Sequence, residues 1–209
     1  MSSKDDISVA VIRRLPRYYR FLGELKKAGV VRVSSRELSE RLGLTASQIR
    51  QDFNRYGGFG HQGYGYNVEK LHEEIGKILG LHYCYTAILI GSGNLGRAVA
   101  NHVLSEQGGF ELIGIFDKKE SLTGQMIREI PIRHVDGLDE FCRENRPKVA
   151  IMCLPEEAAK ELTPQLIDMG ITSFWNFSSY DILLDYPDVL VENVHIGDSL
   201  MTLCYKITW

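Results

Sequence analysis

The sequence lacks the patterns that mark secreted, membrane and metal-binding proteins. Its four cysteines form no C-x-x-C pair, so neither a disulfide framework nor a zinc site is indicated. No apolar run approaches the ~18 residues that a membrane span needs, and the first residues have no apolar signal-peptide region. The six histidines include no H-E-x-x-H motif. We therefore expect a cytoplasmic protein with no metal site and no membrane partner.

The 209 residues also show no large excess of one charge sign, with 24 Lys+Arg against 27 Asp+Glu. A net charge of −3 argues against a nucleic-acid partner, which usually requires a basic surface. The charges are divided unevenly, however, because residues 1–60 carry 12 basic and 6 acidic side chains and residues 61–209 carry 12 and 21. The basic end indicates either an anionic partner such as DNA or a solvated basic face.

The basic segment has helical periodicity. Apolar residues recur every three or four positions over 9–25, which predicts a helix that Pro16 kinks or whose second part it opens. Two capping-box motifs follow, S-x-x-E from Ser34 and T-x-x-Q from Thr45, and each precedes a short helix. Gly43 separates the two helices. Helix, glycine turn and helix is helix-turn-helix geometry, with a plain helical hairpin as the alternative.

The second of these helices has a polar face opposite an apolar one. Ile49 and Phe53 face inward, and the glycine-rich aromatic segment 59–66 predicts a hairpin, the wing of a winged helix. Polar and cationic side chains on the other face have the chemistry to read a major groove. Together with the basic charge, they favour DNA binding. The DNA-contacting candidates are Ser47, Gln48, Arg50, Gln51 and Asn54 on the helix and His61 and Gly63 in the wing.

After Gly80 the pattern changes to alternating strands and helices. Apolar strand-like runs occupy residues 85–90, 110–116, 149–154 and 173–177. Helical stretches lie between them at 95–104, 138–144 and 156–169. This alternation predicts a doubly wound parallel sheet of the α/β class. The sequence therefore predicts a winged helix-turn-helix domain over residues 1–80 and a parallel-sheet domain from residue 81.

A G-x-G-x-x-G motif follows the first of these strands and opens a helix. Gly91 permits a tight turn, Gly93 lets the backbone approach a pyrophosphate, and Gly96 lets the helix pack on the strand. Asp117 stands at the end of the next strand, 21 residues after the last glycine, which is the context of a Rossmann dinucleotide fingerprint. The alternative is a purely structural turn.

The carboxylate of Asp117 also selects the cofactor. It can accept hydrogen bonds from ribose hydroxyls and would repel a 2′-phosphate, which favours NAD and NADH over NADP despite the neighbouring lysines. The cofactor-binding candidates from these segments are Gly91, Ser92, Gly93, Asn94, Leu95, Gly96, Asp117 and Lys118.

The chain shows no residue that would move a proton during hydride transfer. The one Tyr-x-x-x-Lys pair, Tyr66 and Lys70, precedes the glycine loop, and the N-terminal segment leaves no room for a substrate domain. A nicotinamide domain without catalytic groups indicates a sensor that is not an enzyme. Two other interpretations stay open: an NAD-dependent oxidoreductase with an accessory helical domain, and a DNA-binding regulator that senses another nucleotide.

The sequence resembles the Rex redox-sensing transcriptional repressors of bacteria over essentially its whole length. Five segments in one order carry the resemblance. They are Arg14-Leu15-Pro16-Arg17-Tyr18-Tyr19-Arg20, Ala46-Ser47-Gln48-Ile49-Arg50-Gln51-Asp52-Phe53, the 59–66 wing, the 91–96 glycine loop and Val191-Glu192-Asn193-Val194.

The resemblance implies a homodimer in which winged-helix domains are carried on Rossmann domains, the latter spanning residues 81–192. It also implies that the C-terminal helix, over residues 193–209, is swapped onto the partner subunit. Apolar residues recur at helical spacing in this segment. The family's function would be to bind a palindromic operator when NAD⁺ is high and to leave it when NADH binds, with the nicotinamide ring near Leu154 and Pro155.

Two positions depart from the family pattern. Some relatives have an acidic residue after the Asn-Val pair, able to contact the arginine that corresponds to Arg20, whereas this chain has His195 there and Asp198 three residues later. Some relatives also have a tyrosine in the first Rossmann helix where this chain has His102. These four residues are the candidates for the switching network, and its histidines would make it sensitive to pH near neutrality.

Overall fold

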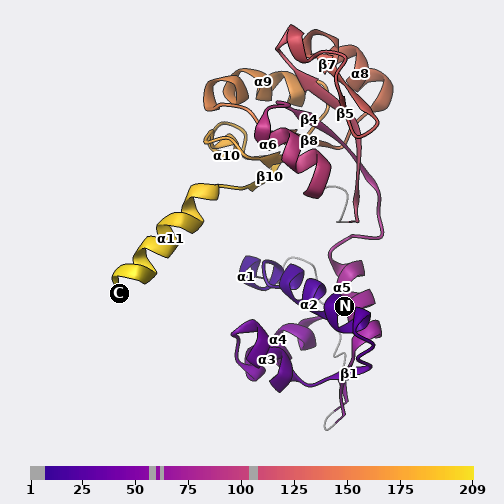
Figure 1. The fold of residues 1–209 in the computed structure, drawn as a ribbon, viewed down its shortest axis with the longest axis vertical. Helices are drawn as coiled ribbons and strands as arrows, with labels where there is room; N and C mark the ends of the chain where they lie inside the picture. Colours follow the sequence, from indigo (N-terminus) through magenta and orange to yellow (C-terminus); the bar gives the residue numbers. More distant parts are fainter. Residues whose placement is uncertain (1–7, 57–59, 62–63, 104–107) are drawn as a thin grey trace. The chain divides into compact units, whose positions relative to one another are not determined.

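The computed structural model describes residues 8–56, 60–61, 64–103 and 108–209, and the chain divides into two compact units, Met1–His82 and Tyr83–Trp209 (Figure 1). We predicted the boundary two residues earlier, after Gly80. Gly80 has a φ of +73°, and the N–H of Leu81 donates to the carbonyl of Gly76 at 3.0 Å. This left-handed turn ends the preceding helix, and its hydrogen bond holds Leu81 against the N-terminal unit.

The N-terminal unit contains five helices among its described residues. Pro16 lies in the first turn of the second, where a missing N–H is not needed, so the periodic segment 9–25 forms two helices instead of one. Ser34 and Glu37 make both bonds of the predicted capping box, at 3.1 and 2.6 Å, and Gly43 ends that helix with a φ of +64°. The helices are α1 (Val9–Ile12), α2 (Leu15–Lys27), α3 (Ser35–Leu42), α4 (Ala46–Arg55) and α5 (Val68–Ile78).

A small antiparallel sheet completes this unit. Its strands β1 (Arg32–Val33), β2 (Gly60–His61) and β3 (Gly65–Asn67) pair in the order β1-β3-β2. The β2–β3 hairpin is the wing that the aromatic, glycine-rich segment predicts. The core beneath it consists of Leu15, Tyr18, Leu22, Val33, Leu38, Leu42, Ile49, Phe53, Tyr66, Val68, Leu71 and Ile75.

The C-terminal unit is built on a seven-stranded sheet in the order β10-β9-β8-β4-β5-β7-β6. Every pair is parallel except β6 with β7. The central strand β4 leads to β5 on one side and neighbours β8 on the other, so the direction of winding reverses there, as in a Rossmann fold. The strands are β4 (Tyr85–Ile90), β5 (Phe110–Asp117), β6 (Met126–Ile127), β7 (Ile130–His134), β8 (Val149–Met152), β9 (Ser173–Asn176) and β10 (Leu190–Asn193).

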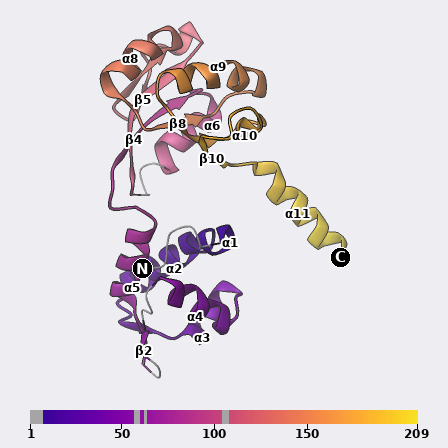
Figure 2. The same ribbon diagram turned by 180° about the vertical axis from the view of Figure 1, so that it is seen from behind.

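Helices cover both faces of this sheet (Figures 1 and 2). Ile88 and Ile90 of β4 pack with α8 and α9, whereas Ala87 and Leu89 pack with η2 on the opposite face, as the alternation of side chains along a strand requires. The helices are α6 (Asn94–Ala98), which continues as the π-helix η2 (Val99–Val103), η3 (Glu120–Leu122), η4 (Val135–Gly137), α8 (Leu138–Asn145), α9 (Glu156–Asp168), α10 (Ile182–Asp185) and α11 (Ile196–Thr208).

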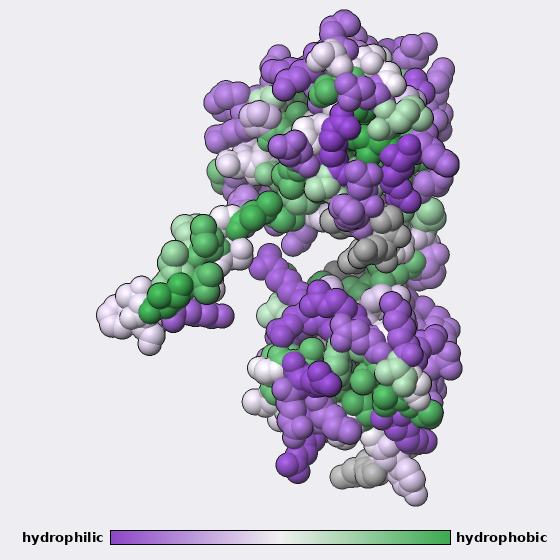
Figure 3. Space-filling model, in the orientation of Figure 1, coloured by the Kyte–Doolittle hydropathy of each residue, from purple (hydrophilic) through white to green (hydrophobic). Residues whose placement is uncertain are grey.

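The last helix, α11, has no buried residue. Figure 3 shows apolar side chains gathered along it, and every residue from His195 to Trp209 is exposed. We predicted a separate C-terminal segment from residue 193, but Asn193 still pairs with Asn176 as the last residue of β10. Among the described residues, no helix has the length and apolar composition to cross a membrane.

Candidate dinucleotide site and nucleic-acid interface

The glycine loop connects β4 to α6 at the carboxyl edge of the sheet. Gly91 has a φ of +94°, and a Cβ there would overlap the carbonyl of Cys153. A Cβ on Gly96 would overlap the carbonyl of Gly91, so this glycine allows the helix to sit against the loop. Gly93 differs, because nothing lies within 4 Å of its Cβ position and its backbone faces open space. The first and last glycines therefore serve packing, and Gly93 leaves room for a ligand.

Asp117 holds this loop in place. Its Oδ2 accepts hydrogen bonds from the backbone N–H and the hydroxyl of Ser92, at 2.7 and 2.8 Å, and its Oδ1 accepts the N–H of Lys119 at 3.0 Å. Burial acts to raise the pKa of Asp117, but these hydrogen bonds outweigh burial and hold the pKa below its usual value. Since each carboxylate oxygen accepts about two bonds, Oδ1 retains capacity for one more donor.

A cavity of about 560 Å³ opens beside the loop at the carboxyl ends of β4, β5 and β8. Six of the predicted cofactor residues line it: Gly91, Gly93, Asp117, Lys118, Leu154 and Pro155. The other four are outside its lining. Ser92 in the loop and Gly96 in α6 are buried, and Asn94 and Leu95 are exposed on the first turn of α6.

Sequence reasoning missed the far wall of this cavity. Lys119 and Leu122 follow β5, and Val135, Asp136 and Asp139 follow β7. The signal was available in the order of strands, because the carboxyl ends of parallel strands meet at one edge. We missed the residues that follow β7 because β7 itself was not predicted.

Two further properties of the cavity concern its thiol and its capacity for metal ions. Burial raises the pKa of the Cys153 thiol to about 12, so it stays protonated near neutral pH. In the part of the chain that the structure describes, no cluster of three or more His, Cys, Asp or Glu side chains could hold a metal ion.

The helix α4 presents one polar face. Ser47, Arg50, Gln51 and Asn54 are exposed at spacings of three and four residues, whereas Ile49 on the other side is fully buried. The guanidinium of Arg50 donates to the hydroxyl of Ser35 at 3.1 Å, which directs it along the start of α3. These four side chains form the surface that we predicted for the groove.

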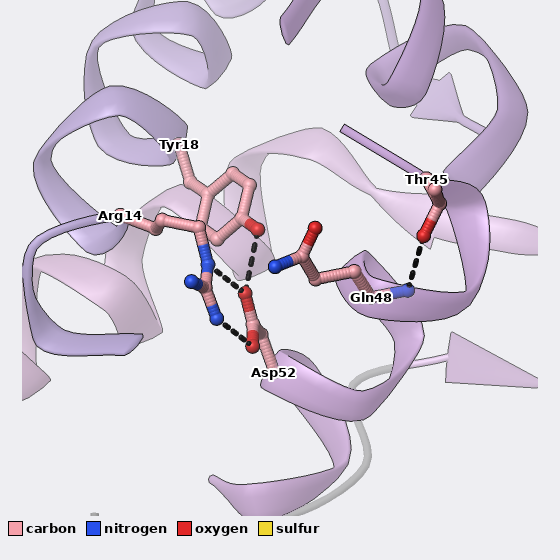
Figure 4. A network of polar contacts seen from close by, with 5 residues as sticks. All are labelled: Arg14, Tyr18, Thr45, Gln48 and Asp52. Atoms are coloured by element: carbon pink, nitrogen blue, oxygen red, sulfur yellow. Dashed lines mark hydrogen bonds and ion pairs between the residues drawn. The ribbon is translucent and has the colours of Figure 1, made fainter. Parts of the chain in front are cut away.

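Gln48 lies apart from that face. Its backbone N–H donates to the hydroxyl of Thr45 at 3.1 Å, but its half-buried side chain turns toward Tyr18 and Asp52, away from Thr45 (Figure 4). The reciprocal bond of the predicted T-x-x-Q capping box is therefore not formed. The side chain of Gln48 is therefore less accessible to a ligand than the four exposed side chains of α4.

A buried ion pair fixes α4 against α2. The guanidinium of Arg14 donates twice to the carboxylate of Asp52, at 2.7 Å in both cases, and the Tyr18 hydroxyl donates to the same carboxylate at 2.7 Å (Figure 4). The Asp52 side chain is only 4% exposed. Burial acts to raise the pKa of Asp52, but the bonds from Arg14 and Tyr18 outweigh it and hold the pKa below its usual value.

In the wing, the backbone of His61 pairs with Gly65, and Gly63 lies outside the described residues. Sequence reasoning missed a cationic side chain, that of Arg32, at the base of the wing. Arg32 donates to the carbonyl of Tyr64 at 3.0 Å, and its guanidinium lies 5.8 Å from the centre of the Tyr64 ring. Arg32 and the exposed Tyr64 are further candidates for contact with DNA.

The four predicted switch residues are divided between the two units. Arg20 is exposed on α2 of the N-terminal unit. His102 lies in the π-helix η2 of the C-terminal unit, a form of helix that is frequent at functional sites. His195 occupies the N-cap position of α11, and its Nδ1 is 3.7 Å from the carboxylate of Asp198.

Comparison with known proteins decides the family. Residues 6–54 match the family model "Putative DNA-binding protein N-terminus", and residues 82–180 match the model "CoA binding domain". The chain is 51% identical over 207 residues to the redox-sensing transcriptional repressor Rex of Caldanaerobacter subterraneus subsp. tengcongensis, covering 99% of this chain and 92% of the relative. The chain belongs to the Rex family. The Rex repressor of Clostridioides difficile is 48% identical, with 98% of this chain and 97% of the relative covered.

Solved Rex-family structures have the same fold. A structure described as RSP in complex with β-NAD⁺ and operator DNA has a TM-score of 0.88 and 50% identity, with 96% of this chain and 92% of that chain covered. A structure of RSP with β-NADH has a TM-score of 0.87 and 47% identity, covering 97% of this chain and 94% of that chain. The predicted fold class, an N-terminal DNA-binding domain on a Rossmann sheet, is confirmed.

Replacing Asp52 with Asn tests the buried ion pair of this Rex chain. We expect Asp52→Asn to lower the free energy of unfolding at pH 7 by about 2–3 kcal/mol, because it leaves Arg14 without its charged partner. The folded pKa of Asp52 lies below its unfolded value of about 4, so its stabilisation is present above that value and is lost as pH falls through the folded pKa. Urea denaturation at several pH values should therefore show the difference from wild type shrinking below about pH 4.

Glu40→Gln is the matched control. It removes the partner of Arg36 in an ion pair whose side chains are 86% and 64% exposed, and we expect a loss of no more than about 0.5 kcal/mol. Equal losses in the two variants would contradict a special role for the buried pair.

Proposed function

We propose that this chain is a transcriptional repressor of the cytoplasm that responds to the NADH/NAD⁺ ratio. As a homodimer it binds a palindromic operator when NAD⁺ prevails and leaves the operator when NADH binds. The observation that carries the proposal is the presence, in one chain, of a glycine-loop cavity and a helix-turn-helix with an exposed polar face. The likeness to RSP structures containing β-NAD⁺ with operator DNA, and β-NADH, supports it.

The cavity suits a dinucleotide. The open backbone at Gly93 and the first N–H groups of α6 would hold the pyrophosphate, and the free capacity of Asp117 Oδ1 suits one ribose hydroxyl. Leu154 and Pro155 would face the nicotinamide end, where the ring is cationic only in its oxidised form. The charge of Asp117 disfavours a 2′-phosphate, which supports NAD(H) as the ligand.

The chain is proposed to sense the dinucleotide and not to oxidise or reduce a substrate with it. The only thiol that lines the cavity, in its described part, is that of Cys153, whose raised pKa makes it a poor nucleophile. The close relatives are named as repressors.

A second copy of the chain is the proposed partner of α11. Its predicted apolar stripe, Ile196, Leu200, Leu203 and Ile207, is between 51% and 76% exposed. A continuous apolar face of this kind normally marks an interface. Two-fold symmetry would then present two α4 helices to two half-sites of a palindrome, one helical turn of DNA apart.

The decisive experiment titrates DNA binding against the redox state of the dinucleotide. A duplex is first selected from a random pool by the protein in the presence of NAD⁺. We expect NADH to raise the apparent Kd for this duplex at least tenfold, and NAD⁺ at the same concentration to leave it nearly unchanged, because only a difference in affinity between two conformations shifts their populations.

NADPH and ATP are titrated in parallel. Equal effects of NADH and NAD⁺ would contradict a redox sensor, and a larger effect of ATP would assign the site to another nucleotide.

Two glycine variants test the site itself. Gly93→Ala places a methyl group where nothing lies within 4 Å, so we expect the melting temperature to change by less than about 2 °C while NADH affinity falls about tenfold or more. Gly96→Ala forces a Cβ onto the Gly91 carbonyl and should instead destabilise the fold by about 2 kcal/mol or more. Calorimetric NADH titration and thermal melting measure the two effects. Unchanged NADH binding by a folded Gly93→Ala protein would place the dinucleotide elsewhere.

Arg50→Ala tests the reading of bases by α4. If the guanidinium pairs with a guanine, its loss removes about 1–3 kcal/mol of discrimination at one base position in each half-site. Competition among duplexes with single-base changes measures this loss. Lys148→Ala removes the same charge from the C-terminal unit and serves as the control. Uniform weakening on all duplexes with a smaller salt dependence would instead make Arg50 a phosphate contact.

A further inference from the structure

The root of α11 is attached to the sheet through β9. Strand β10 runs parallel to β9, and its last pair joins Asn193 to Asn176. One residue later, the N–H of Val194 donates to the backbone carbonyl of Asn176 at 2.8 Å. From His195 onward every residue is exposed. Asn176 therefore receives the last backbone bond before the chain leaves the sheet.

The side chain of Asn176 makes a second connection at the same place. Its Nδ2 donates to Oδ1 of Asn193 and to the carbonyl of Tyr180, both at 2.8 Å. Its Oδ1 accepts the backbone N–H of Ser178 at 3.1 Å and the Ser178 hydroxyl at 2.6 Å. The residue is fully buried, and these four bonds use the whole capacity of the amide. A buried amide with every bond made holds its neighbours in one arrangement.

This amide belongs to the same edge of the sheet as the dinucleotide cavity. The N–H of Cys153 donates to Ile90, that of Phe177 to Met152, and that of Val194 to Asn176, at 2.9, 3.0 and 2.8 Å. These three bonds join the carboxyl ends of β4, β8, β9 and β10 in a continuous row. The row begins beside the glycine loop, passes Cys153 in the cavity wall and ends at the root of α11. A displacement of the cavity wall would therefore reach α11 through β9.

We propose that the hydrogen bond between the side chains of Asn176 and Asn193 is a clamp that sets the direction of α11 and couples it to the dinucleotide site. Both are positioning residues, because neither lines the cavity described above. With the clamp closed, β9 and the root of α11 move as one piece. With it open, α11 is attached by the backbone alone, and a change at the cavity is not passed on. This inference rests on the proposed function for its coupling readout.

Two substitutions of nearly equal size test the clamp. Asn193→Leu removes the acceptor, and Asn193→Asp keeps an oxygen in the same place. Glu192→Gln, at the exposed neighbouring position, is the control for altering the end of β10. The coupling is the ratio of the operator Kd with NADH to that with NAD⁺, on the selected duplex. The affinity for NADH alone and the mass in sedimentation are measured on the same samples.

We expect Asn193→Leu to lower the coupling ratio at least threefold while its NADH affinity and its mass stay within twofold of wild type. Asn193→Asp and Glu192→Gln should keep the ratio. A merely structural role would lower stability but leave the ratio unchanged, and an unchanged ratio in Asn193→Leu would overturn the proposal. Should this variant fail to fold, Asn193→Ser, whose hydroxyl is too short to reach Asn176 Nδ2, decides the question by the same ratio.

Hydrogen exchange of the Val194 amide gives a readout that needs neither DNA nor dinucleotide. We expect this amide to exchange at least tenfold faster in Asn193→Leu than in Asn193→Asp, and equal rates would overturn the clamp. A wild-type coupling ratio of one would instead overturn the proposed redox function, so the two failures are distinguishable.

Discussion

The carboxylate of Asp117 is the constraint on which the proposed dinucleotide site depends. It is nearly buried, yet it stays ionised because the Ser92 N–H, the Ser92 hydroxyl and the Lys119 N–H all donate to it. These bonds tie the end of β5 to the loop after β4. The loop in turn determines where Gly93 exposes its backbone and where α6 begins. One charge therefore shapes the wall that a dinucleotide would meet.

The N-terminal unit uses the same physical solution for a different purpose. Asp52 is also buried and ionised, and its donors are Tyr18 of α2 and Arg14, the residue before that helix. Because Asp52 lies on the inward side of α4, the pair fixes the helix without occupying the face that carries Arg50 and Gln51. In each unit a buried carboxylate positions a proposed binding element, and the exposed groups beside it remain available to a ligand.

Local patterns in the sequence predicted most of the elements that position the site. The capping box at Ser34, the glycine loop and the apolar runs of β4 and β8 depend on neighbours in the sequence, so their signals are visible there. Strand β7 was missed because it contains Pro131, which disfavours a strand. The turn of Gln48 toward Asp52 and the bonds from Ser92 and Lys119 to Asp117 depend on tertiary packing, which no local pattern encodes.

In the proposed dimer, the exposure of α11 would also make the final stage of folding depend on concentration. A helix of 13 residues is marginal in water without a surface to pack against, and α11 buries none of its residues. In the proposed dimer that surface is supplied by the second chain, so the ordering of the C-terminus is a bimolecular step. The amount of repressor in the cell would then control how much of it is fully folded, before any ligand acts on it.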